Sequence, residues 1–153
     1  MEAALAGLVE TNSFTAHREG CLAVAAQLER LLALPGLTAR RVAGQRGGDH
    51  LVFATDAPGA PVGLVGHLDT VFPPGTFEGY RVDGERRRGP GVLDMKGGLV
   101  VVAFALKALA EAGQLASIPL RLVIVADEEI GSPEGRPVIE EHLREARVAL
   151  VFE

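Results

Sequence analysis

Carboxylates gather at one end of the most apolar segment of the sequence. The stretch LVIVADEEIGS, residues 122–132, ends its apolar run in Asp127, Glu128 and Glu129. Three neighbouring carboxylates repel one another, and the end of an apolar strand solvates them poorly. The pattern indicates either an exposed acidic loop or a site where a cation belongs among the acids.

Other apolar runs end in the same way. VGLVGHLD ends in His67 and Asp69, VALVFE ends in Glu153, and GPGVLDMKGG places Asp94 between two glycine pairs. In open parallel sheets, residues that follow the carboxyl ends of the strands lie at one edge of the sheet. One imidazole and several carboxylates there suit a divalent cation such as zinc, which accepts nitrogen and oxygen ligands. Such a cation would also offset the repulsion within the acidic triplet at 127–129.

The spacing of two residue pairs, His67 with Asp69 and Glu128 with Glu129, predicts a different role for each member. On an extended chain His67 and Asp69 face the same side, so Asp69 can hold the second imidazole nitrogen and fix the tautomer. Glu128 and Glu129 are adjacent and should point in different directions. One of them can bind the metal while the other stays free to take a proton from a water at the metal.

The hydrophobic pattern predicts the elements that position these residues. Helices are predicted between Thr15 and Leu34, from Lys96 to Ala112, and in SPEGRPVIEEHLREA. Strands are predicted in LTARRVA, HLVFAT, PVGLVGHL, IPLRLVIVA and RVALVFE, the last of them buried, and YRV and ERRRG should form an edge hairpin turning at Asp83 and Gly84. Apolar strands separated by helices indicate an α/β fold: a mainly parallel sheet with helices on both faces, plus the antiparallel edge hairpin.

Composition limits the classes of protein that this chain can represent. Of its 153 residues, 48% are hydrophobic and 23% are charged, which is typical of a globular domain. The net charge of −5 argues against a general nucleic-acid binder. The single cysteine, Cys21, cannot form an internal disulfide and is expected in the core. The longest apolar run, Gly97–Leu106, is too short to span a bilayer and the start lacks a secretory signal, so we expect a cytoplasmic protein without a membrane partner.

Four motifs, in order and spacing, resemble the M20 family of zinc metallopeptidases, and within it the glutamate carboxypeptidase-like branch. They are GHLDTVFPPG, GPGVLDMKGG, ADEEIGSPEGR and VFE, and the opening LVETNSFTAHREG is also similar to that family. The resemblance implies that residues 1–153 form the amino-terminal portion of a zinc-peptidase catalytic domain. The lid or dimerisation domain and the carboxy-terminal part of the family would then be absent from these residues.

The resemblance implies a centre with two zinc ions. Asp94 would bridge the ions, with His67 and Glu153 on one zinc and Glu129 on the other, and the peptide bond between Asp94 and Met95 would be cis. A final histidine that completes the second zinc in the family has no counterpart here. The number of ions held by this chain, from none to two, therefore stays open, and cobalt is an expected substitute for zinc.

The same resemblance implies a hydrolase. Glu128 would be the general base that takes a proton from zinc-activated water as the water attacks a terminal amide bond, while Asp69 would orient His67. The substrate would be a small peptide or an acyl-amino acid. The apolar margin of a partial catalytic domain also predicts association into homo-oligomers. The expected activity is that of a zinc-dependent carboxypeptidase or amidohydrolase.

Two other functions stay open at this level. The chain could be a truncated, non-catalytic domain of the same family that binds metal, because a zinc held by only two protein ligands is poorly equipped for catalysis. A magnesium-dependent phosphotransfer module of receiver type is disfavoured, because its acidic pair belongs at the first strand whereas residues 127–129 end a late one. A preference for zinc or cobalt over magnesium would separate the first two functions from the third.

Overall fold

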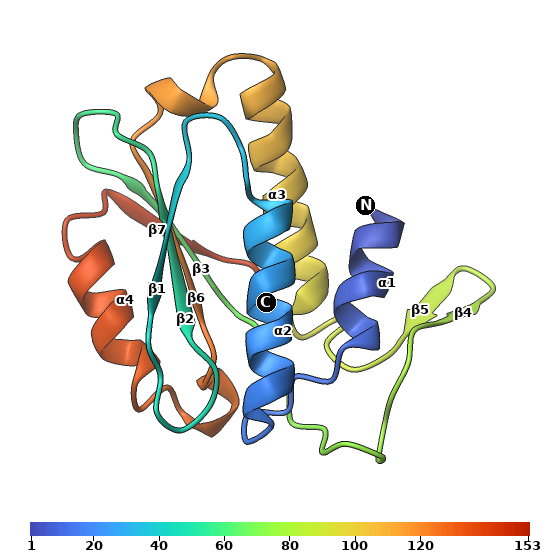
Figure 1. The fold of residues 1–153 in the computed structure, drawn as a ribbon. Helices are drawn as coiled ribbons and strands as arrows, with labels where there is room; N and C mark the ends of the chain where they lie inside the picture. The colour runs from blue at the N-terminus through green and yellow to red at the C-terminus, as the bar shows by residue number, and fades with distance from the viewer.

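The computed structural model describes residues 1–153 as a twisted sheet with helices on either side (Figure 1). The helices are α1 (Glu2–Glu10), α2 (Arg18–Leu31), α3 (Lys96–Glu111) and α4 (Gly135–Leu143), and the 3₁₀ turns are η1 (Leu115–Ser117) and η2 (Glu128–Ile130). The strands are β1 (Thr38–Val42), β2 (His50–Ala54), β3 (Val62–His67), β4 (Arg81–Asp83), β5 (Arg86–Arg88), β6 (Leu120–Val125) and β7 (Val148–Val151). Every strand and helix predicted from the sequence is present, with boundaries shifted by a few residues.

The main sheet has five strands in the order β1-β2-β6-β3-β7. β3 pairs in parallel with β6 and with β7, whereas β2 pairs antiparallel with β1 and with β6. Four strands therefore run in one direction and β2 alone runs in the other, which confirms the prediction of a mainly parallel sheet. The predicted antiparallel hairpin is formed by β4 and β5, but it is a separate two-stranded sheet and does not extend the main one.

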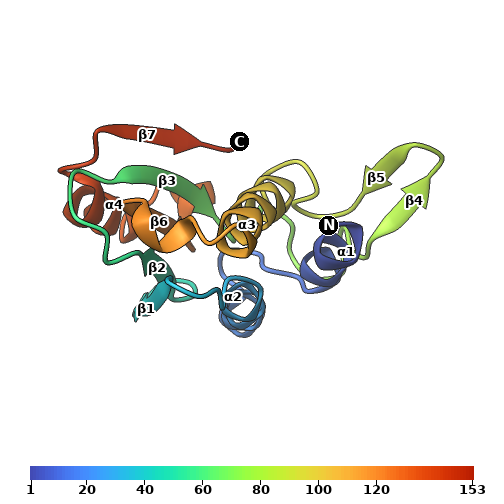
Figure 2. The ribbon, with the colours of Figure 1, turned by 90° about the horizontal axis from the view of Figure 1, so that it is seen from above.

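Helices cover both faces of the main sheet, as predicted (Figure 2). On one face α4 packs through Val138 against Val52, Val123 and Val125 of β2 and β6. On the other face lie α2 and α3, with α1 and the hairpin farther out (Figure 2). The larger core of 21 buried residues fills this second side, and Cys21 on α2 belongs to it, fully buried as expected.

The sequence predicts that the last strand, β7, is buried, and this prediction is wrong. All four of its residues are exposed, and the exposed fraction of Val148, Leu150 and Val151 lies between 45% and 60%. β7 is an edge strand of the sheet, and neither of its faces is covered by a helix. An apolar composition is shared by central and edge strands, so the pattern alone could not separate the two.

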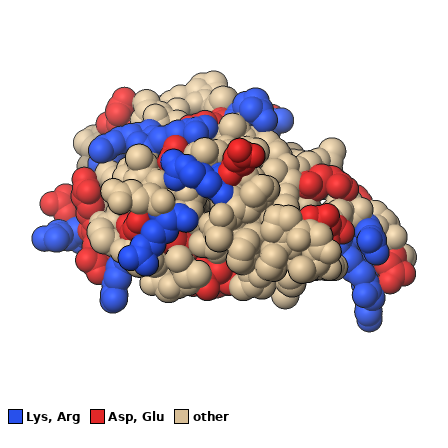
Figure 3. Space-filling model, turned by 60° about the horizontal axis from the view of Figure 1, so that its bottom comes forward, with Lys and Arg blue, Asp and Glu red and all other residues tan.

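The amino-terminal helix α1 was not predicted, because its nine residues are mostly apolar or small and show little helical periodicity. It buries Leu8 and Val9 and lies beside α3. No helix of the structure combines the length and the apolar character needed to cross a membrane. On the face seen in Figure 3, basic and acidic side chains are interspersed, so this face is not the continuous basic surface of a general nucleic-acid binder.

Candidate metal centre

The carboxyl ends of three neighbouring strands lie at one edge of the main sheet. His67 is the last residue of β3, Glu128 follows β6 after two residues, and Glu153 follows β7 after one residue. Asp94 lies just before α3, and the peptide bond that links it to Met95 is cis, as the resemblance implied. Because β3 pairs in parallel with both β6 and β7, the residues that follow these strands meet at the same edge.

A close backbone contact brings the end of β7 against α3. A Cβ atom at Gly98 of α3 would collide with the backbone oxygen of Phe152. Only glycine leaves room for this approach, which carries the neighbouring Glu153 toward the amino end of α3 and Asp94. The glycine pair after DMK in the sequence therefore has a structural task in assembling the cluster.

His67 lies at the base of the cluster. Its Nε2 atom is 2.8 Å from Oδ1 of Asp94 and 3.6 Å from Oε1 of Glu153. His67 is only 1% exposed, whereas the side chains of Asp94 and Glu153 are about half exposed. The nitrogen therefore faces two carboxylates across a space that is open to solvent.

The two adjacent glutamates belong to different groups of ligand atoms. Ligand atoms of His67, Glu128 and Glu153 lie within 4.8 Å of one another, and so do those of His67, Asp94 and Glu129. Both groups depend on the same imidazole. The cluster thus holds two overlapping sets of ligand atoms with one nitrogen between them.

Asp69 lies behind His67 and is fully buried. The Nδ1 atom of His67 is 3.1 Å from the backbone oxygen of Asp69 and 3.4 Å from its Oδ1. The Asp69 carboxylate also accepts hydrogen bonds from the hydroxyl of Thr15 and from the backbone N–H groups of Glu128 and Glu129, at 2.7, 3.2 and 3.3 Å. The sequence predicted the contact with His67, but a single Thr15 far away in the chain gave no signal of its role.

The cluster carries a large excess of negative charge. No lysine or arginine forms an ion pair with any of its five carboxylates, which are those of Asp69, Asp94, Glu128, Glu129 and Glu153. Burial raises the pKa of Glu128 and of Glu129, and the charges of neighbouring carboxylates act in the same direction. A bound cation would relieve this repulsion.

The imidazole of His67 responds to the same charges. Burial lowers its pKa, but the hydrogen bonds and charges of Asp69 and Asp94 outweigh burial and raise the pKa to about 9. For Asp69, burial acts to raise the pKa, and the hydrogen bonds from His67 and Thr15 reverse this and lower it. The neighbouring carboxylates therefore favour a positive charge at His67, and a metal ion bound there would compete with a proton for the imidazole.

The donor set fits a zinc-type cation. It combines one imidazole nitrogen with carboxylate oxygens, which are the ligand types that zinc accepts besides thiolate. The oxygens come from separate elements, and the half-exposed side chains of Asp94 and Glu153 can adjust to an ion. Asp69 supplies the carboxylate behind the histidine that metal-binding imidazoles usually have.

Asp127 does not join Glu128 and Glu129, and its predicted place in an acidic triplet around a cation is wrong. Its buried carboxylate accepts hydrogen bonds from the N–H groups of Glu134 and Gly135, at 2.7 and 3.1 Å. These amides lie at the amino end of α4, where a carboxylate satisfies unpaired N–H groups and the helix dipole favours its charge. The turn η2 directs Asp127 to this helix and the next two glutamates to the opposite side.

A second group of ligand atoms, those of His50, Asp127 and Glu134, also lies within 4.8 Å. Backbone N–H groups already donate hydrogen bonds to these side chains. Oε2 of Glu134 accepts hydrogen bonds from the N–H groups of Gln45 and Arg46, and Nδ1 of His50 accepts one from Ala126. The group therefore ties the β1–β2 loop to the end of β6 and to α4, and we read it as structural.

Lys96, next to the cluster in sequence, is fully buried and points away from it. Its Nζ atom donates hydrogen bonds to the backbone oxygens of Leu8 and Thr11, at 3.0 and 2.9 Å. Burial lowers its pKa to about 8. Lys96 therefore stabilises the end of α1. The sequence signal for this role was a lysine at the start of an otherwise apolar helix.

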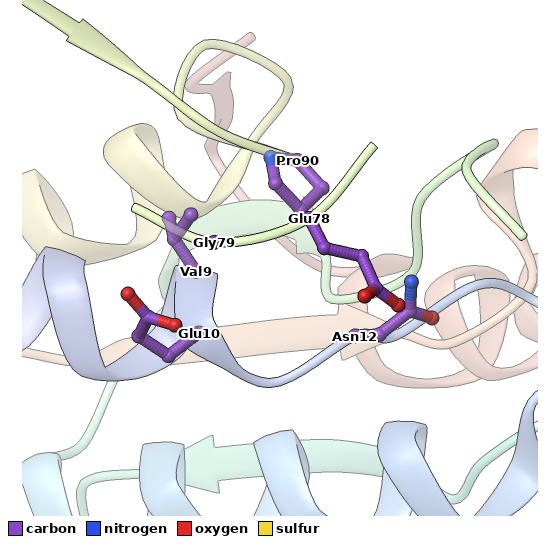
Figure 4. Close-up of a pocket in the computed structure, with 6 residues that line it drawn as sticks. All are labelled: Val9, Glu10, Asn12, Glu78, Gly79 and Pro90. Carbon is purple, nitrogen blue, oxygen red and sulfur yellow. The ribbon is translucent and has the colours of Figure 1, made fainter. Parts of the chain in front are cut away.

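A cavity of about 360 Å³ lies between the end of α1 and the segment that leads into the hairpin. It is lined by Val9, Glu10, Asn12, Glu78, Gly79 and Pro90 (Figure 4). None of these residues belongs to the metal-binding cluster, and the two acids are already engaged. Glu10 accepts a hydrogen bond from the N–H of Tyr80, and Glu78 accepts one from the N–H of Gly75. The chemistry therefore belongs to the cluster and not to this cavity.

Comparison with known proteins agrees with the geometry. Residues 63–153 match the sequence model described as Peptidase family M20/M25/M40. The chain is 34% identical to Carboxypeptidase G2 of Pseudomonas sp. (strain RS-16) over 151 residues, covering 95% of this chain and 36% of that protein. It is 35% identical to Succinyl-diaminopimelate desuccinylase of Xylella fastidiosa (strain 9a5c), covering 90% of this chain and 37% of that protein. The chain thus spans little more than a third of the length of these relatives.

Solved structures show the same fold. Human carnosine dipeptidase 1 superposes with a TM-score of 0.75 at 18% identity, over 98% of this chain and 37% of that one. An M20 family metallo-carboxypeptidase from Sulfolobus solfataricus superposes with a TM-score of 0.77 at 20% identity, over 99% of this chain and 36% of that one. Nearly the whole of this chain therefore shares its fold with part of each of these proteins.

Proposed function

The chain belongs to peptidase family M20/M25/M40, and from this premise we propose that residues 1–153 form the amino-terminal, zinc-binding portion of a metallo-exopeptidase catalytic domain. The observation that carries the proposal is the cluster in which one buried imidazole faces four carboxylates that have no lysine or arginine partner. Its ligand types suit zinc, with cobalt as a substitute. The metallo-carboxypeptidase among the solved structures with this fold supports the same reading.

We assign four metal ligands. They are His67, Asp94, Glu129 and Glu153. Asp94 would be shared by the ligand sets, because its Oδ1 is close to His67 and its carboxylate also groups with Glu129. When bound, zinc would supply Lewis acidity to the scissile carbonyl and would lower the pKa of water at the site.

Glu128 is the proposed general base. Its carboxylate lies beside the ligand atoms of His67 and Glu153, and its backbone N–H is held by Asp69. Burial raises its pKa, which improves a carboxylate as a proton acceptor near neutral pH. Glu128 would take a proton from the attacking water and pass it to the leaving amine, while Asp69 would keep the Nδ1 side of His67 occupied so that Nε2 faces the metal.

The proposed substrate is a terminal amide bond in a small peptide or an acyl-amino acid. Its support comes from the relatives, a carboxypeptidase and a succinyl-diaminopimelate desuccinylase, whose names denote removal of a carboxyl-terminal residue and of a succinyl group. Both names describe the cleavage of an amide bond.

A second candidate function is a non-catalytic metal-binding domain of the same family. The specific observation in its favour is the sharing of His67 between the two sets of ligand atoms. If one ion takes the imidazole, the other is left with carboxylates only, and two such protein ligands are few for a catalytic zinc. This chain would then hold one ion and would hydrolyse nothing by itself.

Zinc content separates these possibilities. The 153-residue chain is dialysed against trace zinc, its zinc per chain is measured by elemental mass spectrometry, and hydrolysis of acyl-glutamates and dipeptides is assayed on the same sample. Two ions with turnover support the peptidase, and one ion without turnover supports the non-catalytic domain. His67→Ala should abolish the tightest zinc in either case, whereas His142→Ala, outside the cluster, should keep it. Absence of zinc from the wild-type chain would refute the metal site.

A further inference from the structure

Thr15 is a buried residue for which the proposed mechanism has no task. It is 3% exposed, and its hydroxyl donates a hydrogen bond of 2.7 Å to Oδ2 of Asp69. The backbone around it is held separately, because Thr15 N donates to the oxygen of Thr70 at 3.2 Å and Thr70 N donates to the oxygen of Ser13 at 2.9 Å. The hydroxyl is therefore not needed to keep residues 13–15 in place.

The Asp69 carboxylate connects Thr15 to both halves of the metal-binding cluster. Its Oδ1 accepts a hydrogen bond from the N–H of Glu128 and lies 3.4 Å from Nδ1 of His67. Its Oδ2 accepts hydrogen bonds from the N–H of Glu129, at 3.3 Å, and from Thr15. One carboxylate thus holds the imidazole that binds metal and the backbone that carries the two glutamates.

This carboxylate depends on its hydrogen bonds. It is fully buried, and its basic neighbour is the imidazole of His67, whose Nδ1 lies 3.4 Å from Oδ1. A buried charge is tolerated only when donors surround it, and the hydroxyl of Thr15 makes the shortest of these contacts. Without that hydroxyl, Oδ2 keeps one longer bond, from Glu129, and the carboxylate is free to shift toward its remaining donors.

We propose that Thr15 is a positioning residue whose hydroxyl fixes the Asp69 carboxylate, so that Asp69 holds the His67 ring and the Glu128–Glu129 backbone in the arrangement that binds metal. The effect on metal affinity rests on the proposed zinc site. We call the hydrogen bonds that run from Thr15 through Asp69 to the Glu128 and Glu129 amides the relay. The relay involves only side chains and amides of this chain and can be tested without metal.

Three variants test the relay. Thr15→Val keeps the shape of the side chain and removes the hydroxyl, while Thr15→Ser keeps the hydroxyl. Ser13→Ala is the matched control, because Ser13 is also fully buried in the same segment but donates to the backbone oxygen of Leu68, at 2.7 Å, and not to Asp69. Zinc affinity is measured by competition with a chelator. Hydrogen exchange of the Glu128 and Glu129 amides is measured by NMR on the metal-free chain.

We expect Thr15→Val to weaken zinc binding roughly tenfold, which is the lower end of the loss caused by changing the direct partner of a metal-binding histidine, because Thr15 acts on that histidine only through Asp69. The two amides should exchange roughly tenfold faster, because their acceptor is no longer fixed. Thr15→Ser should restore both values to near those of the wild type. Ser13→Ala should lower the melting temperature while changing neither value more than its loss of stability accounts for.

Two results would overturn the inference. In one, Thr15→Val matches the wild type in zinc affinity and in amide exchange. In the other, Ser13→Ala reproduces the losses of Thr15→Val, which would make Thr15 a contributor to stability alone. A wild-type chain that binds no zinc refutes the proposed function instead, and the exchange of the Glu128 and Glu129 amides then decides the relay by itself.

Discussion

Each carboxylate of the cluster acts according to what its oxygens already bind. Those of Asp69 are saturated by hydrogen bonds inside the protein, so this residue can orient its neighbours but has no capacity left for an ion. Asp94 and Glu153 have only the imidazole of His67 as a partner and are half exposed, so their oxygens are free for a metal. The number of occupied oxygens thus separates positioning residues from ligands.

Glu128→Gln gives the sharpest test of the proposed base. The amide keeps the size of the side chain but cannot accept a proton, so the rate of hydrolysis by the zinc-loaded chain should fall by roughly 10²- to 10⁴-fold. Zinc per chain should stay unchanged, because Glu128 is not among the assigned ligands. Glu129→Gln is the matched variant and should lose zinc affinity. Undiminished hydrolysis by Glu128→Gln would mean that another group takes the proton.

Sequence patterns located most of the cluster at the residue scale. His67, Asp94, Glu128, Glu129 and Glu153 all follow apolar runs or glycine pairs, and the structure brings them together. The sequence pattern does not predict the direction in which a side chain points from an irregular turn. The chain bends sharply at η2, so Asp127 contacts α4 whereas Glu128 and Glu129 lie in the cluster. The local sequence does not determine these directions, which depend on the surrounding fold.

Asp127 links the end of β6 to the start of α4. Asp127→Ala would leave the N–H groups of Glu134 and Gly135 without their acceptor at a buried helix end. We expect the free energy of unfolding, measured in urea, to fall by about 1–3 kcal/mol. The exposed Asp56 offers a control, since Asp56→Ala should change stability little.

The same variant tests the corrected position of Asp127. Zinc per folded chain should be unaffected by Asp127→Ala, because its carboxylate faces α4. Loss of zinc at unchanged stability would return Asp127 to the metal site and would refute the geometry described here.

Lys96 performs a similar task for α1. Its Nζ donates hydrogen bonds to the backbone oxygens of Leu8 and Thr11. These oxygens lie at the carboxyl end of α1, where no following helical turn supplies N–H donors. Lys96→Met keeps the length of the side chain and removes both hydrogen bonds. We therefore expect a loss of about 1–3 kcal/mol in the free energy of unfolding. Lys107→Met on the same helix is the control, because Lys107 is half exposed. Equal stability of Lys96→Met and the wild type would show that α1 docks without this lysine.

Helices and strands were predicted correctly where the sequence shows a clear hydrophobic period or residues typical of turns. The prediction failed for burial, which depends on the elements that pack next to a strand. The helix beginning at Lys96 and the hairpin with Gly84 in its turn were found from local signals. β7 was given a buried position because Val148–Val151 is uniformly apolar, yet its burial depends on what lies next to it in the sheet. α1 lacks a local signal altogether and is held by a lysine 85 residues away.

At the scale of the whole molecule, the sheet ends in an unusual edge. β7 pairs with β3 on one side only, and its exposed valines and leucine form an apolar margin beside the cluster. Unpaired apolar edges attract other strands unless charges or bulges protect them. β7 contains neither a charged residue nor a proline. The other sheet edge, β1, carries Arg40 and Arg41 and is protected in this way.

This contrast predicts that copies of the 153-residue chain associate through β7. Light scattering coupled to size-exclusion chromatography should give a mass that rises above that of the monomer with concentration. Val148→Lys, which places a charge on the edge, should shift the population toward monomer. Val82→Lys is the matched control, because Val82 is similarly exposed but lies in the separate hairpin. A wild-type chain that stays monomeric at high concentration would contradict the prediction, and equal effects of the two lysines would place the contact away from β7.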